Sequence, residues 1–290
     1  MLDPHLIQAS HGHVHQIDVV TDLLHGNYEP VTTVAHAFAK SHIGLGVADR
    51  LDGEIISIDG TTWRIPATGI PVTAESDLGL PFAISAVGGV AIHQDLEPGM
   101  SEADLATFVA DFVKTANDGA HNIAAIRIDG IFRNVLLRSE HKQEPPFRHL
   151  DEVLREEVLF PFESWSGTLA GFVYPQVSQP GEPTGEVIPG LHLHAISSDH
   201  TSGGHLHHAT VTQAAIRMWL DDADISIPQS RLSHALNLLE HVIEWGSPTQ
   251  QFQAKQLIEL LRSSGSTPAD FTSAIALHDA YLHDPYLERS

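Results

Sequence analysis

Alternating apolar and polar positions mark several strands in the first 220 residues of this chain. The stretch SHIGLGVADRLDGEIISIDGTTWRI at 41–65 predicts strands joined by Gly and Asp turns, with LDGE and IDG as hairpin corners. The segment at 122–138 also alternates, and it predicts two short strands around an Asp129-Gly130 turn. Further strands are predicted in LPFAISAVGGVAI and SWSGTLAGFVYP. These patterns indicate a chain built mainly on β-sheet.

Helical spacing of apolar residues interrupts the strands and then dominates the end of the chain. The segment at 101–117 has a capping Ser and Asp followed by an apolar stripe, which predicts a helix that covers a sheet. Three more helical patterns follow at 232–245, 252–261 and 270–282. The order of elements predicts a mixed α/β (α+β) fold, with mixed and antiparallel sheets flanked by helices.

Composition and charge narrow the classes of function. The chain has 290 residues, 15 basic against 37 acidic, and a formal net charge of −22. Such a charge repels phosphate backbones, so nucleic-acid and anionic-membrane partners are not expected. The sequence has neither a signal-peptide pattern nor an apolar run of membrane-spanning length, so a cytoplasmic protein is expected.

Cysteine is absent, whereas histidine occurs 21 times. Disulfides, thiolate metal sites and cysteine nucleophiles are therefore excluded, and any transition metal must bind histidine and carboxylate groups.

The stretch GLHLHAISSDHTSGGH at 190–205 is the strongest candidate for such a site. In a strand His192 and His194 share one face, and the Gly203-Gly204 pair is the expected bend that returns His205 to it. Three histidines leave coordination positions open, as catalytic zinc requires. By spacing alone, a solvated polar face of a histidine-rich strand pair explains the pattern equally well.

Three neighbouring histidines are weaker candidates. His200 lies within the expected turn, and His207 and His208 follow the third expected ligand. We expect surface or supporting positions for them.

The same stretch resembles the zinc-binding segment of the acetolactate decarboxylase family. HIGLGVADRLDGEIISIDG resembles the family's GLGTF…LDGE…LDG segment, and AAIRIDGIF resembles its AIRIDGTF segment. KQEPPFRHLDEV…FESWSGTLAGF resembles its long connection and the strand that follows. Together these segments cover about residues 20 to 220 in the family's order.

This resemblance implies roles for particular residues. It implies that His192, His194 and His205 bind Zn²⁺, that Glu54 is the first active-site carboxylate, and that Arg127 is the active-site arginine. Taken alone, Glu54 fits a water-facing turn carboxylate, and Arg127 fits an exposed strand residue paired with an acid.

The family also uses a second glutamate near its C-terminus, for which Glu244 is the best candidate and Glu240 the rival. The chain departs from the family there, because it continues to Ser290, and His200 stands where the family commonly has arginine.

The resemblance further implies zinc-dependent decarboxylation of (S)-2-acetolactate to (R)-acetoin and CO2, within acetoin biosynthesis. Zinc would chelate the substrate's hydroxyl and ketone and stabilise the enediolate, while Arg127 holds the carboxylate and Glu54 and Glu244 relay protons. The alternatives are another zinc hydrolase or lyase on the same scaffold, and a zinc-binding homologue without activity.

The implied organisation is a catalytic unit at 1–246, with sheet subdomains about 1–138 and 139–246, and a helical extension at 247–290. A homodimer is a further expectation.

Overall fold

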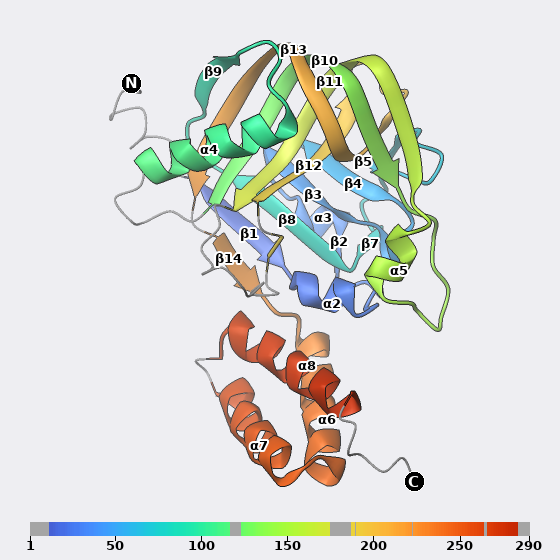
Figure 1. Cartoon of the computed structure of the whole chain (residues 1–290), viewed down its shortest axis with the longest axis vertical. Coiled ribbons are helices and arrows are strands. Elements are labelled where there is room, and N and C mark those ends of the chain that lie inside the picture. The colour runs from blue at the N-terminus through green and yellow to red at the C-terminus, as the bar shows by residue number, and fades with distance from the viewer. Residues whose placement is uncertain are drawn as a thin grey trace.

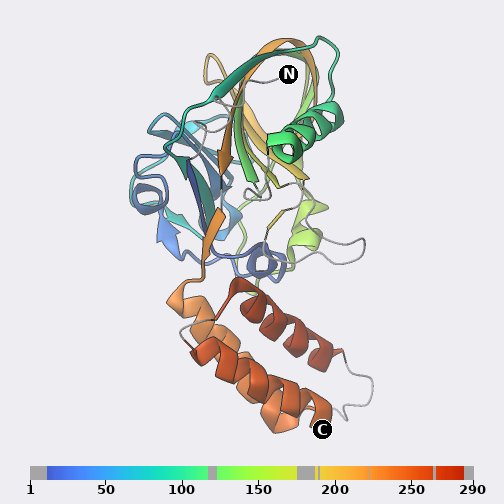
Figure 2. The same cartoon turned by 90° about the vertical axis from the view of Figure 1, so that its left-hand side faces the viewer.

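The computed structural model describes residues 12–116, 123–174, 187–188, 190–221, 223–263 and 266–283. Two β-sheets form the upper body of the molecule, and a bundle of helices lies below them (Figures 1 and 2). The expected mixed α/β (α+β) fold is confirmed.

A seven-stranded sheet is built mostly from the first part of the chain. All its neighbouring strands are antiparallel except the pair β14 and β1, which is parallel. In spatial order its strands are β14 (Ala223–Ser226), β1 (His13–Ile17), β8 (Phe82–Val87), β3 (Ile43–Val47), β4 (Glu54–Ile58), β5 (Thr61–Ile65) and β6 (Val72–Thr73). A small pair, β2 (Thr32–Thr33) and β7 (Gly79–Leu80), lies apart from it.

A second, five-stranded sheet curls until its strands β10 and β13 also pair with each other. Its strands are β9 (Ile92–Leu96), β10 (Ile123–Ser139), β11 (Val158–Tyr174), β12 (Gly190–Ser197) and β13 (Gly203–Asp221). The two sheets interleave along the sequence, because β14 joins the first sheet after β13 has ended. The expected sheet boundary near 138 falls at the end of β10 rather than between the sheets.

The expected turn at Asp129-Gly130 is wrong, because β10 runs through both residues without interruption. Gly130 instead allows strands β10 and β13 to approach each other closely. A Cβ at this position would lie 2.4 Å from the carbonyl oxygen of Gln213 on β13. The missing side chain therefore lets β10 and β13 pair at this point.

Two apolar layers hold the sheets in place. One fills the space between the sheets and includes Ile43, Leu45 and Ile56 from the first sheet and Phe172 from the second. The other lies on the opposite face of the second sheet, where Leu105, Val109, Phe112 and Val113 of α4 (Glu102–Ala116) pack. Shorter helical segments are α2 (Val20–Leu24), α3 (Val34–Ala37), η1 (Asp49–Leu51) and α5 (Leu150–Leu154).

The last part of the chain is a three-helix bundle, and the three predicted helical patterns are confirmed. Its helices are α6 (Gln229–Trp245), α7 (Pro248–Arg262) and α8 (Pro268–Leu282). They share one apolar cluster, which includes Leu239, Ile258 and Phe271. The expected boundary at 246 thus falls after α6, although α6 packs with the helices that follow it.

The bundle is anchored to the sheets beside α2. Val19 joins its apolar cluster, and Arg231 of α6 lies with its Nε 2.9 Å from a carboxylate oxygen of both Asp18 and Asp22. Burial, with repulsion from Asp22, raises the pKa of Asp18 to about 7. Within the described residues, no helix is long and apolar enough to span a membrane.

Candidate active site

The three predicted ligand histidines come together between the sheets. His192 and His194 alternate along β12 with Leu193 and Ala195, which belong to the apolar layer on the opposite face. His205, near the start of β13, lies directly opposite His194 in the antiparallel pairing. The expected strand-turn-strand geometry of this stretch is confirmed.

The geometry of the cluster suits one metal ion. Ligand nitrogens of the three histidines lie within 4.8 Å of one another. Their ring centroids are 5.0–5.3 Å apart. Burial lowers the pKa of all three, and for His192 and His205 the pKa falls well below 6.5. The rings are therefore neutral at pH 7, which is the form that binds a metal.

His194 presents a bare nitrogen to the cluster. Its Nδ1–H donates a hydrogen bond to the backbone carbonyl of Ile55 over 2.7 Å, so the proton is held on the side away from the site. Among the described residues its Nε2 is buried without a hydrogen-bond partner. A buried nitrogen without a partner is costly in an apolar interior, and a metal ion would satisfy it.

Glu54, the first residue of β4, points at the histidines and is only 4% exposed. One carboxylate oxygen lies 3.2 Å from Nε2 of His194, and the other is 3.9 Å from Nδ1 of His205. The alternative of a water-facing turn carboxylate therefore does not describe this residue.

The arginine at this site is Arg138, not Arg127. Arg138 lines the same pocket as the histidines, and its Nη1 lies 2.9 Å from Glu54. Arg127 instead pairs with Asp129 on its own strand and with Asp59, beyond the far end of β4. The structure thus differs from the expectation for Arg127.

A change in strand alternation explains how both arginines come from one strand. Ile126 and Ile128 face the apolar layer beneath α4, but beyond Asn134, where φ is 51°, Val135 and Leu137 face it. The alternation therefore switches by one residue. Arg127 and Arg138 lie on the same face although they are eleven positions apart, or roughly 35 Å of strand.

Gly204 brings Arg138 close to the histidines. Arg138 on β10 is the register partner of His205 on β13. Gly204 has a φ of 147°, and a Cβ there would lie 2.4 Å from the backbone oxygen of Arg138. The Gly203-Gly204 pair therefore opens β13 rather than forming the expected bend, which Ser198–Ser202 provides.

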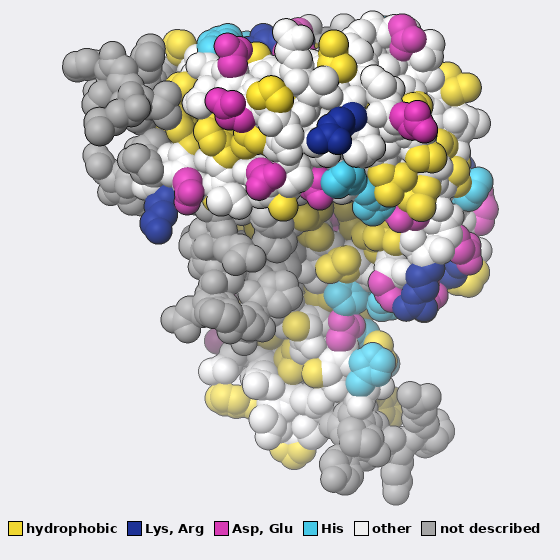
Figure 3. All heavy atoms as spheres, turned by 45° about the horizontal axis from the view of Figure 1, so that its top comes forward, with side chains coloured by type: hydrophobic (Ala, Val, Ile, Leu, Met, Phe, Trp, Pro, Cys, Tyr) yellow, Lys and Arg dark blue, Asp and Glu magenta, His cyan; other side chains and the backbone are white. Residues whose placement is uncertain are grey.

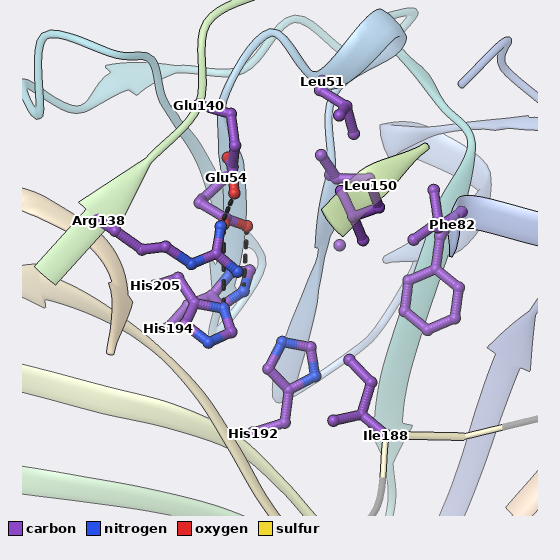
Figure 4. Close-up of a pocket in the computed structure, with 13 residues that line it drawn as sticks. Leu51, Glu54, Phe82, Arg138, Glu140, Leu150, Ile188, His192, His194 and His205 are labelled. Carbon is purple, nitrogen blue, oxygen red and sulfur yellow. Dashed lines mark hydrogen bonds and ion pairs between the residues drawn. The ribbon is translucent and has the colours of Figure 1, made fainter. Parts of the chain in front are cut away.

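Three carboxylates surround the guanidinium of Arg138. Its Nη1 contacts Glu54 and Glu140, and its Nε lies 3.2 Å from Glu157. Figure 4 shows Arg138 between the two pocket glutamates and the histidines. Among the described residues, the side-chain hydrogen bond of Arg138 runs from Nη1 to Glu54, and its Nη2 donates none. One edge of the guanidinium is therefore available to a bound molecule.

Glu140 was not predicted from the sequence, whereas Glu244 was. Glu140 follows β10 directly, is 4% exposed and lines the pocket. The structure places Glu244 on an exposed position of α6, in the bundle, and the rival Glu240 pairs with Arg262 of α7. Neither bundle glutamate lines the pocket of the histidines.

The weaker histidine candidates lie outside the cluster of three nitrogens. His200 is exposed in the turn, with its ring centroid 5.0 Å from that of Trp63. His207 pairs with Glu157 over 2.9 Å, and His208 pairs with Glu102 over 2.8 Å. His207 therefore supports the glutamate that holds Arg138.

Apolar side chains form the remaining wall of the pocket. They are Leu23, Val47, Leu51, Phe82, Leu150 and Ile188. In Figure 4, Leu51, Leu150 and Phe82 lie across the pocket from Arg138 and Glu54. On the face seen in Figure 3, acidic side chains are scattered and basic ones are few, so attraction of an anion depends on the pocket itself.

Comparisons with known proteins identify the family of this chain. The family model described as alpha-acetolactate decarboxylase matches residues 14–237, a range that ends within α6. An alpha-acetolactate decarboxylase of Raoultella terrigena is 31% identical over 193 residues, which cover 67% of this chain and 71% of the relative. One of Klebsiella aerogenes is likewise 31% identical over 193 residues, with the same coverage.

Solved structures show the same fold. The crystal structure of alpha-acetolactate decarboxylase from Bacillus subtilis strain 168 matches with a TM-score of 0.67 and 24% identity. The match covers 75% of this chain and 89% of that one.

Proposed function

The chain belongs to the alpha-acetolactate decarboxylase family, which makes it a decarboxylase, and we propose that it converts acetolactate to acetoin and CO2 at the three-histidine pocket. One observation carries this proposal. Three neutral imidazoles converge beside a buried glutamate and an arginine with one free edge, in a pocket with an apolar wall.

The residues present fit a divalent transition metal. His192, His194 and His205 would hold it, since three neutral imidazole ligands suit zinc and leave coordination positions for substrate. The bare Nε2 of His194 supports this assignment. A metal bound there would supply Lewis-acid stabilisation for the negative charge that develops when CO2 leaves.

Arg138 is the residue we propose to hold the substrate's carboxylate. Its Nη2, which donates no hydrogen bond among the described residues, would be the donor to the substrate, while Glu54, Glu140 and Glu157 hold the rest of the guanidinium. This positive charge lines the pocket, so it provides a local attraction for an anion that the net charge of −22 would otherwise repel.

Glu54 is proposed to bind the tertiary hydroxyl of acetolactate. Its carboxylate lies between His194 and Arg138, so an accepted hydrogen bond from the hydroxyl would orient the carbon that loses CO2. The apolar wall opposite suits the two methyl groups of the substrate and excludes water from the reacting carbon.

The test is an acetoin assay on the purified chain. With acetolactate as substrate, we expect equimolar acetoin and CO2, loss of both after treatment with a chelator, and recovery on addition of one equivalent of zinc. Hydrolysis of model esters without acetoin formation would overturn the proposal in favour of a hydrolase, and tight zinc binding with no turnover would indicate a homologue without activity.

A further inference from the structure

A second buried carboxylate lies beside Glu54 in the pocket. Glu140 comes from the segment that follows β10, whereas Glu54 begins β4, so two distant parts of the chain supply them. Both are 4% exposed, and Figure 4 shows both directed at the guanidinium of Arg138. Ionisable side chains are almost never this buried unless they are paired or functional.

One oxygen of Glu140 is left without a partner. Its Oε1 contacts Nη1 of Arg138, but within the described part of the chain its Oε2 is buried with no hydrogen-bond partner. The other carboxylates around Arg138 have no such buried, unpartnered oxygen among the described residues, and Glu157 also pairs with His207. A purely structural carboxylate would be expected to use both oxygens.

The charges around Arg138 explain why one carboxylate would carry a proton. Arg138 brings one positive charge, and Glu54, Glu140 and Glu157 bring three negative charges when all are ionised. Carboxylates that share one cation disfavour each other's ionisation. Among the described residues, Glu140 is the one of the three with a buried oxygen that lacks a hydrogen-bond partner, and Glu157 is the most exposed at 19%. Glu140 is therefore the member with least support for its charge.

We infer that Glu140 is the general acid of the reaction, an inference that rests on the proposed function. The bond between the tertiary carbon and the carboxylate breaks, CO2 leaves, and the electron pair stays with the remaining fragment. The tertiary carbon then takes the proton from Glu140, the ketone is restored, and Glu140 is reprotonated from water. One proton is consumed for each acetolactate anion, so the products acetoin and CO2 balance.

The placement of Glu140 also accounts for a product of one hand. An acid fixed on one side of the carbon delivers its proton to one face only. Solvent water has no such constraint once it reaches the carbon.

The experiment compares Glu140→Gln and Glu140→Asp with Glu144→Gln. Glu144 lies four residues further along, is exposed and pairs only with Arg50 among the described residues, so it is the matched control. We measure zinc content, kcat, KM and the enantiomeric excess of acetoin formed in D2O. For Glu140→Gln we expect unchanged zinc, KM within about threefold, kcat lower by on the order of 10² to 10⁴, and loss of enantiomeric excess. Glu140→Asp should recover part of both, and Glu144→Gln should match the original chain.

Each other outcome overturns the inference. A Glu140→Gln protein with unchanged kcat and enantiomeric excess would show that the proton comes from elsewhere. Loss of zinc with retained folding would make Glu140 part of the metal site rather than an acid. If Glu140→Gln does not fold, Glu140→Asp provides the test. Unchanged kcat together with racemic acetoin in that variant would exclude Glu140 as the general acid. An original chain that forms no acetoin would instead overturn the proposed function, and this role with it.

Discussion

Two arginines on strand β10 sit in carboxylate clusters at opposite ends of β4, and only one cluster has the properties of an active site. Arg138 and its partners Glu54, Glu140 and Glu157 have side chains that are between 4 and 19% exposed. Arg127 itself is 16% exposed, but its partners Asp59 and Asp129 are 63% and 37% exposed. The carboxylates around Arg127 are therefore more accessible to water than those around Arg138, and ion pairs accessible to water contribute little.

The neighbours of the two clusters differ as well. Beside Arg138 lie three neutral histidines, an apolar wall and a carboxylate oxygen that has no hydrogen-bond partner in the described part of the chain. Beside Arg127 lies a second arginine, Arg217, which shares Asp129 with it. The first cluster thus has an excess of acid and unfilled donor and acceptor positions, whereas the second is closed by its own ion pairs. The pairing of an arginine with carboxylates is therefore not enough to identify a substrate site.

Replacing His194 by alanine should have the largest effect, because it removes a ligand nitrogen and the hydrogen bond that orients it. We expect the protein to lose both stoichiometric zinc and detectable acetoin formation. Metal analysis after dialysis, paired with the acetoin assay, measures both. Full zinc content with normal turnover in this variant would contradict the assignment of the active site to the Arg138 cluster.

The carboxylates at the two ends of β4 offer the next test. Glu54→Gln should keep zinc but lower kcat by on the order of 10² to 10⁴, because a neutral amide accepts a weaker hydrogen bond from the substrate's hydroxyl and cannot take its proton. Asp59→Asn, at the other end, should leave kcat unchanged. Steady-state kinetics of the two variants measures whether only the Glu54 end of β4 affects kcat. Equal losses in both would mean that the substrate interacts with the whole length of β4.

The two arginines themselves should differ by a smaller factor. Arg138→Lys keeps the charge but loses the planar fork that contacts Glu54, Glu140 and Glu157, so kcat/KM should fall on the order of 10- to 100-fold. Arg127→Lys should stay within about twofold, since its partners are accessible to water. The reverse ranking of the two variants would restore Arg127 as the substrate-binding arginine.

The smallest predicted effect concerns stability rather than activity. Partial burial acts to raise the pKa of Asp129, but hydrogen bonds from Thr168 and Arg217 and attraction by Arg127 lower it overall from 3.8. The unfolded chain then binds this proton more readily, so the contribution of Asp129 is complete above about pH 4 and is lost as the pH falls below it.

Asp129→Asn should reduce the acid-induced loss in the free energy of unfolding by about 1 kcal/mol or less. Acetoin formation should not change. Urea unfolding of both proteins between pH 3 and 6 measures the loss. A change in kcat for Asp129→Asn would contradict the separation of the two clusters.

Strand alternation made the histidine cluster predictable, because His192 and His194 needed only a period of two to share a face. The same alternation could not predict that Arg138 is the arginine of the pocket. Its side depends on the switch in alternation beyond Asn134, and its proximity depends on the register of β10 with His205, which no local pattern encodes. An arginine at the end of an alternating stretch, two residues before a glutamate, was the available signal in LLRSE.

The second carboxylate was unpredictable for a related reason. Glu140 opens a polar, proline-containing segment, and such composition usually indicates exposure, yet the residue is 4% exposed. Glu244 had the position expected from the family, but α6 packs into the bundle and leaves it exposed. Burial of this kind follows from tertiary packing and not from periodicity.

The most direct test of the account is the position of the metal in crystals of the zinc-loaded protein, from anomalous scattering at the zinc edge. We predict one peak within about 2.0–2.1 Å of a ring nitrogen of His192, His194 and His205, on the side of the pocket that faces Glu54 and Arg138. A peak away from these three rings, or no peak in protein that forms acetoin, would contradict it.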